Sequence, residues 1–332
     1  MNINSNNYSA TVDITTRCNL SCKHCRTENI DYDLSLEQVE ETAKKLSHPN
    51  RKIVFISGGE PLIRKDIVQI ISIFKKYIPF VCINTNSLLL NEDLLDELIE
   101  VGLNYIQVSL DGIKDTHDYI RGKGCFDTTM EKLKMISNKN IKLHISCCVS
   151  KLNIDSMYDF VKELLLIHNI KVDILGFKRF IPKNEMAGTY NLGKDGLKKL
   201  YNNYESIKKD FSHITNIVVD FPQKNIFNIE QVNNIIKKYK LSCAGCSAAT
   251  GGPCIRVDGS VSPCSLLYVN AGSIFEHSLD EIYETEPFLE ICKRNLKGKC
   301  GICNYKLICG GCRAAAMALN NDYLAEDSEC FI

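Results

Sequence analysis

Three cysteines near the start of the chain have a spacing suited to holding an iron–sulfur cluster. Cys18, Cys22 and Cys25 form the pattern C-x3-C-x2-C. A cubic [4Fe–4S] cluster needs four ligands, and cysteine thiolates commonly supply them. Three thiolates leave one iron open for a substrate or cofactor, so the pattern predicts chemistry at that iron. Zinc also binds thiolates, but without a fourth ligand nearby zinc is the weaker alternative.

A second and larger group of cysteines lies near the end of the chain. Ten of the 17 cysteines fall within residues 243–332. The densest run has the pattern C-x2-C-x5-C-x2-C over residues 300–312, and Cys330 follows it. This density predicts an iron–sulfur site, with a pair of zinc ribbons as the alternative. The rise in cysteine content near residue 240 also predicts a domain boundary there.

The first two thirds of the chain alternate apolar runs with helical patterns. We expect buried parallel strands at 11–15, 52–57, 79–85, 104–110, 141–149 and 171–177. Helices are expected near 35–47, 65–77, 91–101, 127–137, 154–167 and 193–209, the first of them starting at a capping box of Ser35 and Gln38. Six such units predict a parallel sheet that curls toward a barrel, although periodicity alone also allows an open doubly wound sheet.

Polar motifs follow the ends of these strands. After the second strand come Gly58, Gly59, Glu60 and Pro61. The glycines would let the backbone approach a ligand, and the carboxylate could accept a hydrogen bond from a ligand ammonium. The alternative is an ordinary strand-to-helix turn with Pro at the first helical position. Later strand ends carry further polar residues, for which turn or capping roles are equally compatible: Thr85, Asn86, Ser109, Asp111 and, a little beyond, Arg121.

Together, the cysteine motif after strand one and Gly-Gly-Glu-Pro after strand two resemble the radical S-adenosylmethionine (radical SAM) superfamily. In that family SAM chelates the open iron and the glycine-rich motif binds its amino group. His24 departs from the family, which usually has an aromatic residue there. The resemblance implies a partial (β/α)6 TIM-like barrel with the site at the strand C-terminal ends. It also implies that the later polar residues line the SAM pocket: Thr85, Asn86, Ser109, Asp111 and Arg121.

The C-terminal cysteines resemble the SPASM extension of radical SAM maturases, a small cysteine-rich domain that holds two auxiliary [4Fe–4S] clusters. By that resemblance auxiliary cluster II takes Cys300, Cys303, Cys309 and Cys330. Auxiliary cluster I takes Cys243, Cys246, Cys264 and Cys312, with Cys254 possible in place of Cys243. An unligated Cys254 would be a candidate hydrogen donor. The expected division is a barrel at 1–215, a bridging segment at 216–240 and the SPASM domain at 241–332.

The resemblance implies an enzyme that cleaves SAM to a 5′-deoxyadenosyl radical and abstracts hydrogen from a substrate. The leading expectation is a ribosomal peptide or protein, modified by crosslinking, thioether formation, dehydrogenation or epimerisation. Residues 177–182 also resemble relatives that process haem precursors or peptides, and they do not define the substrate. The alternative is a small-molecule oxidative decarboxylase in a haem-like pathway. Ser265 replaces the Asp of sulfatase-maturating relatives, so that activity is not expected. The non-enzymatic alternative is an electron-transfer iron–sulfur protein.

Composition and charge restrict the partners. Lys plus Arg and Asp plus Glu are equal at 40 each, so we expect no nucleic-acid partner. No apolar segment predicts a signal peptide or a membrane span. We therefore expect a cytoplasmic protein whose cysteines bind metal rather than form disulfides. The resemblance implies a flavodoxin- or ferredoxin-type electron donor and allows a separate peptide-recognition protein, since no N-terminal recognition module is expected in the chain.

Overall fold

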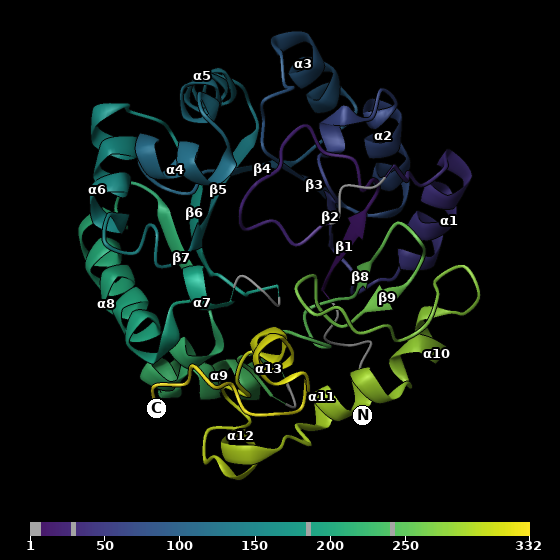
Figure 1. Ribbon diagram of the computed structural model, residues 1–332. Coiled ribbons are helices and arrows are strands. Elements are labelled where there is room, and N and C mark those ends of the chain that lie inside the picture. Colours follow the sequence, from purple (N-terminus) through teal and green to yellow (C-terminus); the bar gives the residue numbers. More distant parts are fainter. Residues whose placement is uncertain (1–7, 28–30, 184–186, 240–242) are drawn as a thin grey trace.

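The computed structural model describes residues 8–27, 31–183, 187–239 and 243–332. Within these residues, nine strands form one sheet in the order β7-β6-β5-β4-β3-β2-β1-β8-β9. Strands β1 to β7 pair in parallel, and their order across the sheet is their order along the chain (Figure 1). They are β1 (Ser9–Asp13), β2 (Ile53–Ser57), β3 (Phe80–Thr85), β4 (Tyr105–Ser109), β5 (Lys142–Val149), β6 (Ile174–Arg179) and β7 (Asn216–Asp220).

Helices connect these strands and lie around the outside of the curled sheet (Figure 1). They are α1 (Leu36–Leu46), α2 (Ile67–Tyr77), α3 (Glu92–Glu100), α4 (Lys114–Arg121), α5 (Cys125–Ser137), α6 (Met157–Lys162), α7 (Ala187–Tyr190) and α8 (Gly193–Phe211). The predicted capping box is confirmed at α1: Gln38 N donates to Ser35 Oγ at 3.2 Å, and Ser35 N donates to Gln38 Oε1 at 2.9 Å.

The predicted fold class, a partial parallel barrel followed by a cysteine-rich domain, is confirmed. All six predicted strands are present within a few residues of their predicted positions. The structure adds α4 and β7, which sequence periodicity did not predict. The segment expected as a bridge contains β7, a 3-10 turn at Pro222–Asn228 and α9 (Ile229–Tyr239). The proposed domain boundary at 240 lies outside the described residues and stays a prediction.

The sheet stays open because another part of the chain occupies the edge of β1. The short strand β8 (Cys254–Ile255) pairs in parallel with Thr11 and Val12, and β9 (Val261–Ser262) pairs antiparallel with β8. The remaining C-terminal helices lie across the open side of the barrel (Figure 1). They are α10 (Leu279–Tyr283), α11 (Glu286–Lys293), α12 (Gly298–Ile302) and α13 (Arg313–Asn320).

Alternation along the strands separates the core from the barrel interior. Because successive side chains of a strand point to opposite faces, one set packs beneath the helices and is fully buried, for example Val54, Ile56, Val81, Ile83, Ile106, Val108, Leu143 and Ile145. The other set faces inward and is largely polar, including Asn84, Gln107, His144 and Ser146. The fold therefore presents polar groups to the space inside the barrel. Across the described residues, the structure has no helix long and apolar enough to cross a membrane.

Candidate cofactor sites and barrel cavity

The loop that carries the first three cysteines is fastened to the end of β2. Gly59 N donates to Thr15 O at 2.8 Å, and Glu60 N donates to Arg17 O at 2.8 Å. A Cβ on Gly58 would lie 2.2 Å from Thr15 O, and one on Gly59 would lie 2.2 Å from Arg17 O. Only glycine fits such a close approach. The two glycines thus allow β2 to approach the backbone of the cysteine loop itself.

The three thiols lie on one short loop with polar groups around them. Cys18 and Cys22 are half-buried and Cys25 is exposed. Leu20 N donates to Cys18 Sγ at 3.5 Å, and Arg121 Nη1 lies 4.0 Å from Cys22 Sγ. Burial raises the pKa of the Cys22 thiol to about 11, while the Arg121 charge opposes this. Three sulfur donors beside a guanidinium fit an anionic cluster that keeps one iron open.

Glu60 is engaged by the chain itself. Its carboxylate is 1% exposed and accepts hydrogen bonds from Thr85 Oγ1 at 2.6 Å, Asn86 N at 2.7 Å and Leu62 N at 3.0 Å. Burial raises its pKa, and these donors oppose the rise. Asn86 also donates through Nδ2 to Asn19 in the cysteine loop at 2.8 Å. Glu60, Thr85 and Asn86 therefore link β2, β3 and the loop, and Pro61 begins the 3-10 turn Pro61–Ile63.

A buried ion pair lies on the opposite side of the loop. Arg121 Nε donates to Asp111 Oδ2 at 2.6 Å, and Cys148 N donates to Asp111 Oδ1 at 2.9 Å. Burial acts to raise the pKa of Asp111, but the charge of Arg121, followed by His24 and His117, lowers it to about 2. Asp111 is therefore an anion that fixes the orientation of Arg121 toward the cysteine loop.

A cavity of about 670 Å³ fills the barrel interior at the C-terminal ends of the strands. Five of the predicted site residues line it together: Cys25, Gly58, Ser109, Asp111 and Arg121. A second cavity of about 580 Å³ adjoins it, and both are lined by Asp13, Arg26, Thr27, Arg256, Leu266 and Tyr268. These volumes are typical of small-molecule and cofactor sites.

The junction of the two cavities contains three side chains that sequence reasoning missed. Two guanidinium groups lie over the Tyr268 ring, with Cζ of Arg256 4.1 Å and Cζ of Arg26 5.2 Å from the ring centroid. Arg256 Nη1 also donates to Asp13 Oδ2 at 2.9 Å. These residues come from distant segments without a recognisable motif, so no sequence signal identified them.

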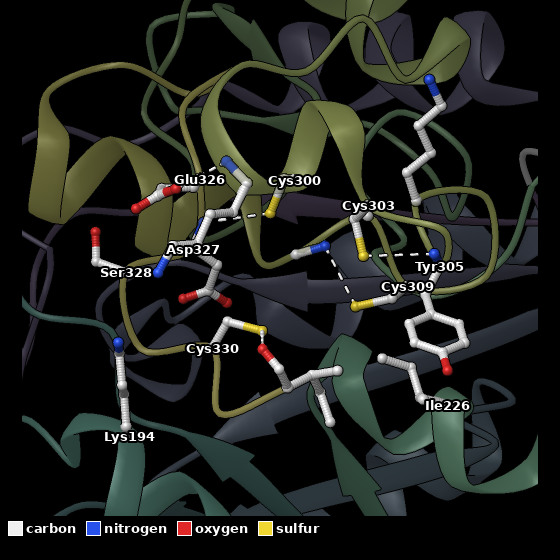
Figure 2. A pocket seen from close by; sticks show the side chains of 15 residues that line it. Lys194, Ile226, Cys300, Cys303, Tyr305, Cys309, Glu326, Asp327, Ser328 and Cys330 are labelled. Atoms are coloured by element: carbon white, nitrogen blue, oxygen red, sulfur yellow. Dashed lines mark hydrogen bonds between the residues drawn. The ribbon is translucent and has the colours of Figure 1, made fainter.

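Four C-terminal cysteines surround one small cavity of about 70 Å³: Cys300, Cys303, Cys309 and Cys330. Figure 2 shows their sulfur atoms facing a common space between α12 and the end of the chain. Backbone amides donate to three of them: Asp327 N to Cys300 at 3.5 Å, Tyr305 N to Cys303 at 3.4 Å and Gly311 N to Cys309 at 3.4 Å. A set of four sulfur donors with N–H groups directed at them fits a fully ligated [4Fe–4S] cluster.

The remaining C-terminal cysteines divide into smaller groups. Burial raises the pKa of both Cys264 and Cys312, and the charge of Cys246 adds to the rise in each. Cys243 acts in the same way on Cys292 of α11, a residue given no role by the sequence. Cys254 is 1% exposed on β8, and burial, followed by the charge of Asp13, raises its pKa. The ligand set of auxiliary cluster I therefore stays a prediction, with Cys243 or Cys254 as its fourth member.

Comparison with known protein families gives two matches. The model of the Radical SAM superfamily matches residues 12–164, and that of the SPASM iron–sulfur cluster-binding domain matches residues 246–312. The first match covers the cysteine loop and strands β2 to β5. The second covers most of the C-terminal cysteines.

Individual relatives match almost the whole chain. The AdoMet-dependent heme synthase of Methanosarcina barkeri is 30% identical over 96% of this chain and 94% of its own length. The antilisterial bacteriocin subtilosin biosynthesis protein AlbA of Bacillus subtilis is 27% identical over 91% of this chain and 66% of its own length. Among solved structures, Streptococcus suis SuiB bound to the precursor peptide SuiA has a TM-score of 0.77, with 17% identity over 99% of this chain and 76% of that chain.

Proposed function

Because this chain belongs to the radical SAM superfamily and has a C-terminal SPASM domain, we propose that it oxidatively decarboxylates a tetrapyrrole that bears carboxylate groups. Its cofactors are those of the two domains: SAM with a [4Fe–4S] cluster, and auxiliary iron–sulfur clusters. When bound, SAM and its cluster supply hydrogen-abstracting radical chemistry, and the auxiliary clusters supply electron acceptors. The chain itself must hold these groups, bind the substrate and exclude water.

We propose one set of cysteine ligands for each of the three clusters. Cys18, Cys22 and Cys25 hold the SAM cluster beside the large cavity. The four cysteines of the small cavity hold auxiliary cluster II. Auxiliary cluster I takes Cys246, Cys264 and Cys312, with Cys243 as its fourth ligand and Cys254 as the alternative. We also propose that Ser109, Asp111 and Arg121 line the SAM pocket, with Glu60, Thr85 and Asn86 supporting the loop from behind.

The observation that carries the substrate class is the charge of the barrel cavity. Three of its guanidinium groups pair with carboxylates: Arg121 with Asp111, Arg256 with Asp13, and Arg179 with Asp327 and Glu329. Among the residues that the structure describes, Arg26, Lys178 and Lys224 also line the cavity and form no ion pair, and only one further carboxylate on its wall, Asp220, is likewise without one. A cavity with cations left over favours an anionic ligand, because its charges are only partly compensated by the protein.

The relatives support a haem precursor as that ligand. A propionate side chain becomes a vinyl group when it loses one hydrogen atom, one electron and CO2, and we propose this conversion for the present chain because one of its relatives is a heme synthase. The match to that relative covers nearly the full length of both chains, whereas the match to AlbA covers 66% of AlbA. We therefore place the small-molecule substrate ahead of the peptide that the sequence favoured.

The test is turnover of the reconstituted enzyme with a defined porphyrin. Anaerobic protein with SAM, a reduced flavodoxin or ferredoxin and Fe-coproporphyrin III is expected to form 5′-deoxyadenosine. The porphyrin is expected to lose the mass of one formic acid for each decarboxylated side chain. Formation of 5′-deoxyadenosine with an unchanged porphyrin mass would rule out this substrate.

Peptide modification is the second candidate. It is favoured by the second cavity, since two adjoining cavities of about 670 and 580 Å³ extend from the barrel toward the C-terminal domain and offer space for an extended chain. The similarity to AlbA points the same way. Such an enzyme would use a peptide encoded beside its gene, with or without a separate recognition protein. Mass spectrometry of that peptide after turnover would reveal a crosslink, a thioether or loss of hydrogen.

A further inference from the structure

A row of polar side chains crosses the floor of the barrel cavity. Asn84 on β3 is opposite Gln107 on β4, and Gln107 is opposite His144 on β5. All three line the cavity. Gln107 and His144 precede Ser109 and Ser146 by two residues on their strands, so they lie about 7 Å deeper in the barrel at about 3.3 Å per residue. The row is therefore below the level of Ser109, Asp111 and Arg121.

Two atoms of this row are buried without a hydrogen-bond partner in the described structure: Asn84 Oδ1 and His144 Nε2. Buried polar atoms are nearly always paired, because an unpaired one loses its hydration without compensation. Here both belong to residues that line a cavity large enough for a ligand. A ligand that reaches the floor would supply an acceptor for a protonated His144 Nε2, whereas Asn84 Oδ1 requires a donor.

The backbone of β6 leaves space at the imidazole. Gly176 pairs with Ser146 on β5, and a Cβ on Gly176 would lie 2.8 Å from His144 Nε2. Any side chain at position 176 would displace the ring. The glycine thus lets the imidazole lie against the bare backbone of β6.

A cation lies next along the same face of β6. Lys178 follows Gly176 by two residues and lines the cavity. Burial, and after it the charge of Lys178, lowers the pKa of His144 to about 4. The imidazole is therefore neutral near pH 7 and carries one N–H. Asp220 is opposite Lys178 on β7, yet no ion pair joins the two within the described residues.

We propose that His144 and Lys178 together bind one carboxylate of the substrate at the β5–β6 wall of the barrel. A neutral imidazole N–H and an ammonium both donate hydrogen bonds, and a carboxylate accepts from both at once. Lys224, which lines the same cavity and donates to Val219 O, adds a second positive charge on the β7 side. This inference rests on the proposed function and names the side chains that recognise its anionic substrate.

The test measures binding of two porphyrin probes to the reconstituted holoenzyme. Fe-coproporphyrin III carries four carboxylates, and its tetramethyl ester carries none. Dissociation constants come from the shift of the porphyrin absorption band for wild type, Lys178→Met, His144→Phe and His144→Gln. Lys162→Met on the exposed face of α6 and His213→Phe before β7 are matched controls with the same changes of side chain. Iron content and circular dichroism verify that each variant is folded.

We expect Lys178→Met and His144→Phe each to weaken binding of the acid by at least about tenfold, the scale for losing a hydrogen bond to a charged group. His144→Gln, which keeps a donor, should recover part of the loss. Neither control should change binding, and binding of the ester should not depend on these residues. Equal binding of the acid by wild type and both variants would overturn the inference and leave the proposed function intact.

Two further outcomes separate the failures. If wild type binds neither probe, the proposed substrate is wrong and the inference is wrong with it. If Lys178→Met and His144→Phe weaken SAM binding as much as porphyrin binding, the pair serves the cofactor, which also overturns the proposal.

Discussion

The cysteine loop after β1 and the four-cysteine cavity near the C-terminus are built differently. The loop presents three thiols, and Cys25 among them is exposed and lines a cavity of about 670 Å³. The C-terminal site gathers four thiols around a cavity of about 70 Å³. A site with one ligand fewer and a large adjoining space leaves room for a reacting molecule. A site with four thiols around a small cavity is suited to transferring electrons without binding a reacting molecule.

Each site has a buried arginine–carboxylate pair beside it, but the two pairs have different surroundings. Arg121 and Asp111 line the large cavity and contact Cys22 of the loop. Arg179 Nη1 and Nη2 donate to Asp327 at 2.7 and 2.9 Å, and Asp327 in turn accepts from Cys312 N at 3.0 Å. Both members of the first pair thus line the large cavity, whereas in the second pair only Arg179 does. The second connects β6 of the barrel to the cysteine-rich region.

The largest expected effect tests whether the three-cysteine loop holds the reactive cluster. Replacing Cys18, Cys22 and Cys25 together by Ala should abolish 5′-deoxyadenosine formation. Iron should fall from about twelve to about eight atoms per chain, at four irons per cluster. The measurement is iron and sulfide analysis after anaerobic reconstitution, with SAM turnover assayed in parallel. Wild type with only about four irons would mean that the C-terminal thiols hold something else.

Removing a cysteine of the C-terminal cavity should impair product formation while SAM cleavage continues. Cys303→Ala should remove about four irons while SAM is still cleaved, because the loop cluster keeps its three ligands. Product formation should fall much further than 5′-deoxyadenosine formation, since the electron from the substrate loses its acceptor. If both fall in parallel, the two sites are not separate in function.

The fourth ligand of auxiliary cluster I can be found by comparing three buried thiols. Cys243→Ala should lower the iron content by up to about four atoms, and Cys254→Ala should leave it unchanged. Cys292→Ala is the matched control, since Cys292 donates to Ala249 O at 3.5 Å and lies near Cys243. A loss of iron in Cys254→Ala instead would exchange the two roles. It would also remove Cys254 as a candidate hydrogen donor.

The sequence predicted the parts of both sites that depend on local spacing. The cysteine loop and six of the seven barrel strands could be predicted because short motifs and apolar runs define them, whereas the four cysteines of the small cavity were grouped only through the resemblance to the SPASM domain. Arg26, Arg256 and Tyr268 could not be predicted, because the fold brings them together from segments more than 200 residues apart. Glu60 shows a subtler limit: the motif identified the residue, but its hydrogen bonds to Thr85 and Asn86 became visible only in the folded chain.

Removing the cation of the second arginine pair should reduce stability without removing a thiol. Arg179→Met leaves Asp327 and Glu329 buried without their partner, which typically costs about 3–5 kcal/mol. We expect a lower denaturant midpoint and release of the auxiliary clusters before the loop cluster. Urea unfolding followed by cluster absorbance and circular dichroism measures both. A free energy of unfolding within about 0.5 kcal/mol of wild type would contradict a structural role for this pair.

The smallest expected effect concerns the helix capping box, a motif that both regions contain. Ser35 begins α1 beside the cysteine loop, and Ser278 begins α10 in the C-terminal region, each in a complete capping box. Ser35→Ala and Ser278→Ala should each lower the free energy of unfolding by about 1 kcal/mol. Iron content should not change in either variant. A loss of about four irons in Ser35→Ala alone would show that the loop depends on the start of α1, since Leu34 N donates to Ile14 O at 3.0 Å just before the loop.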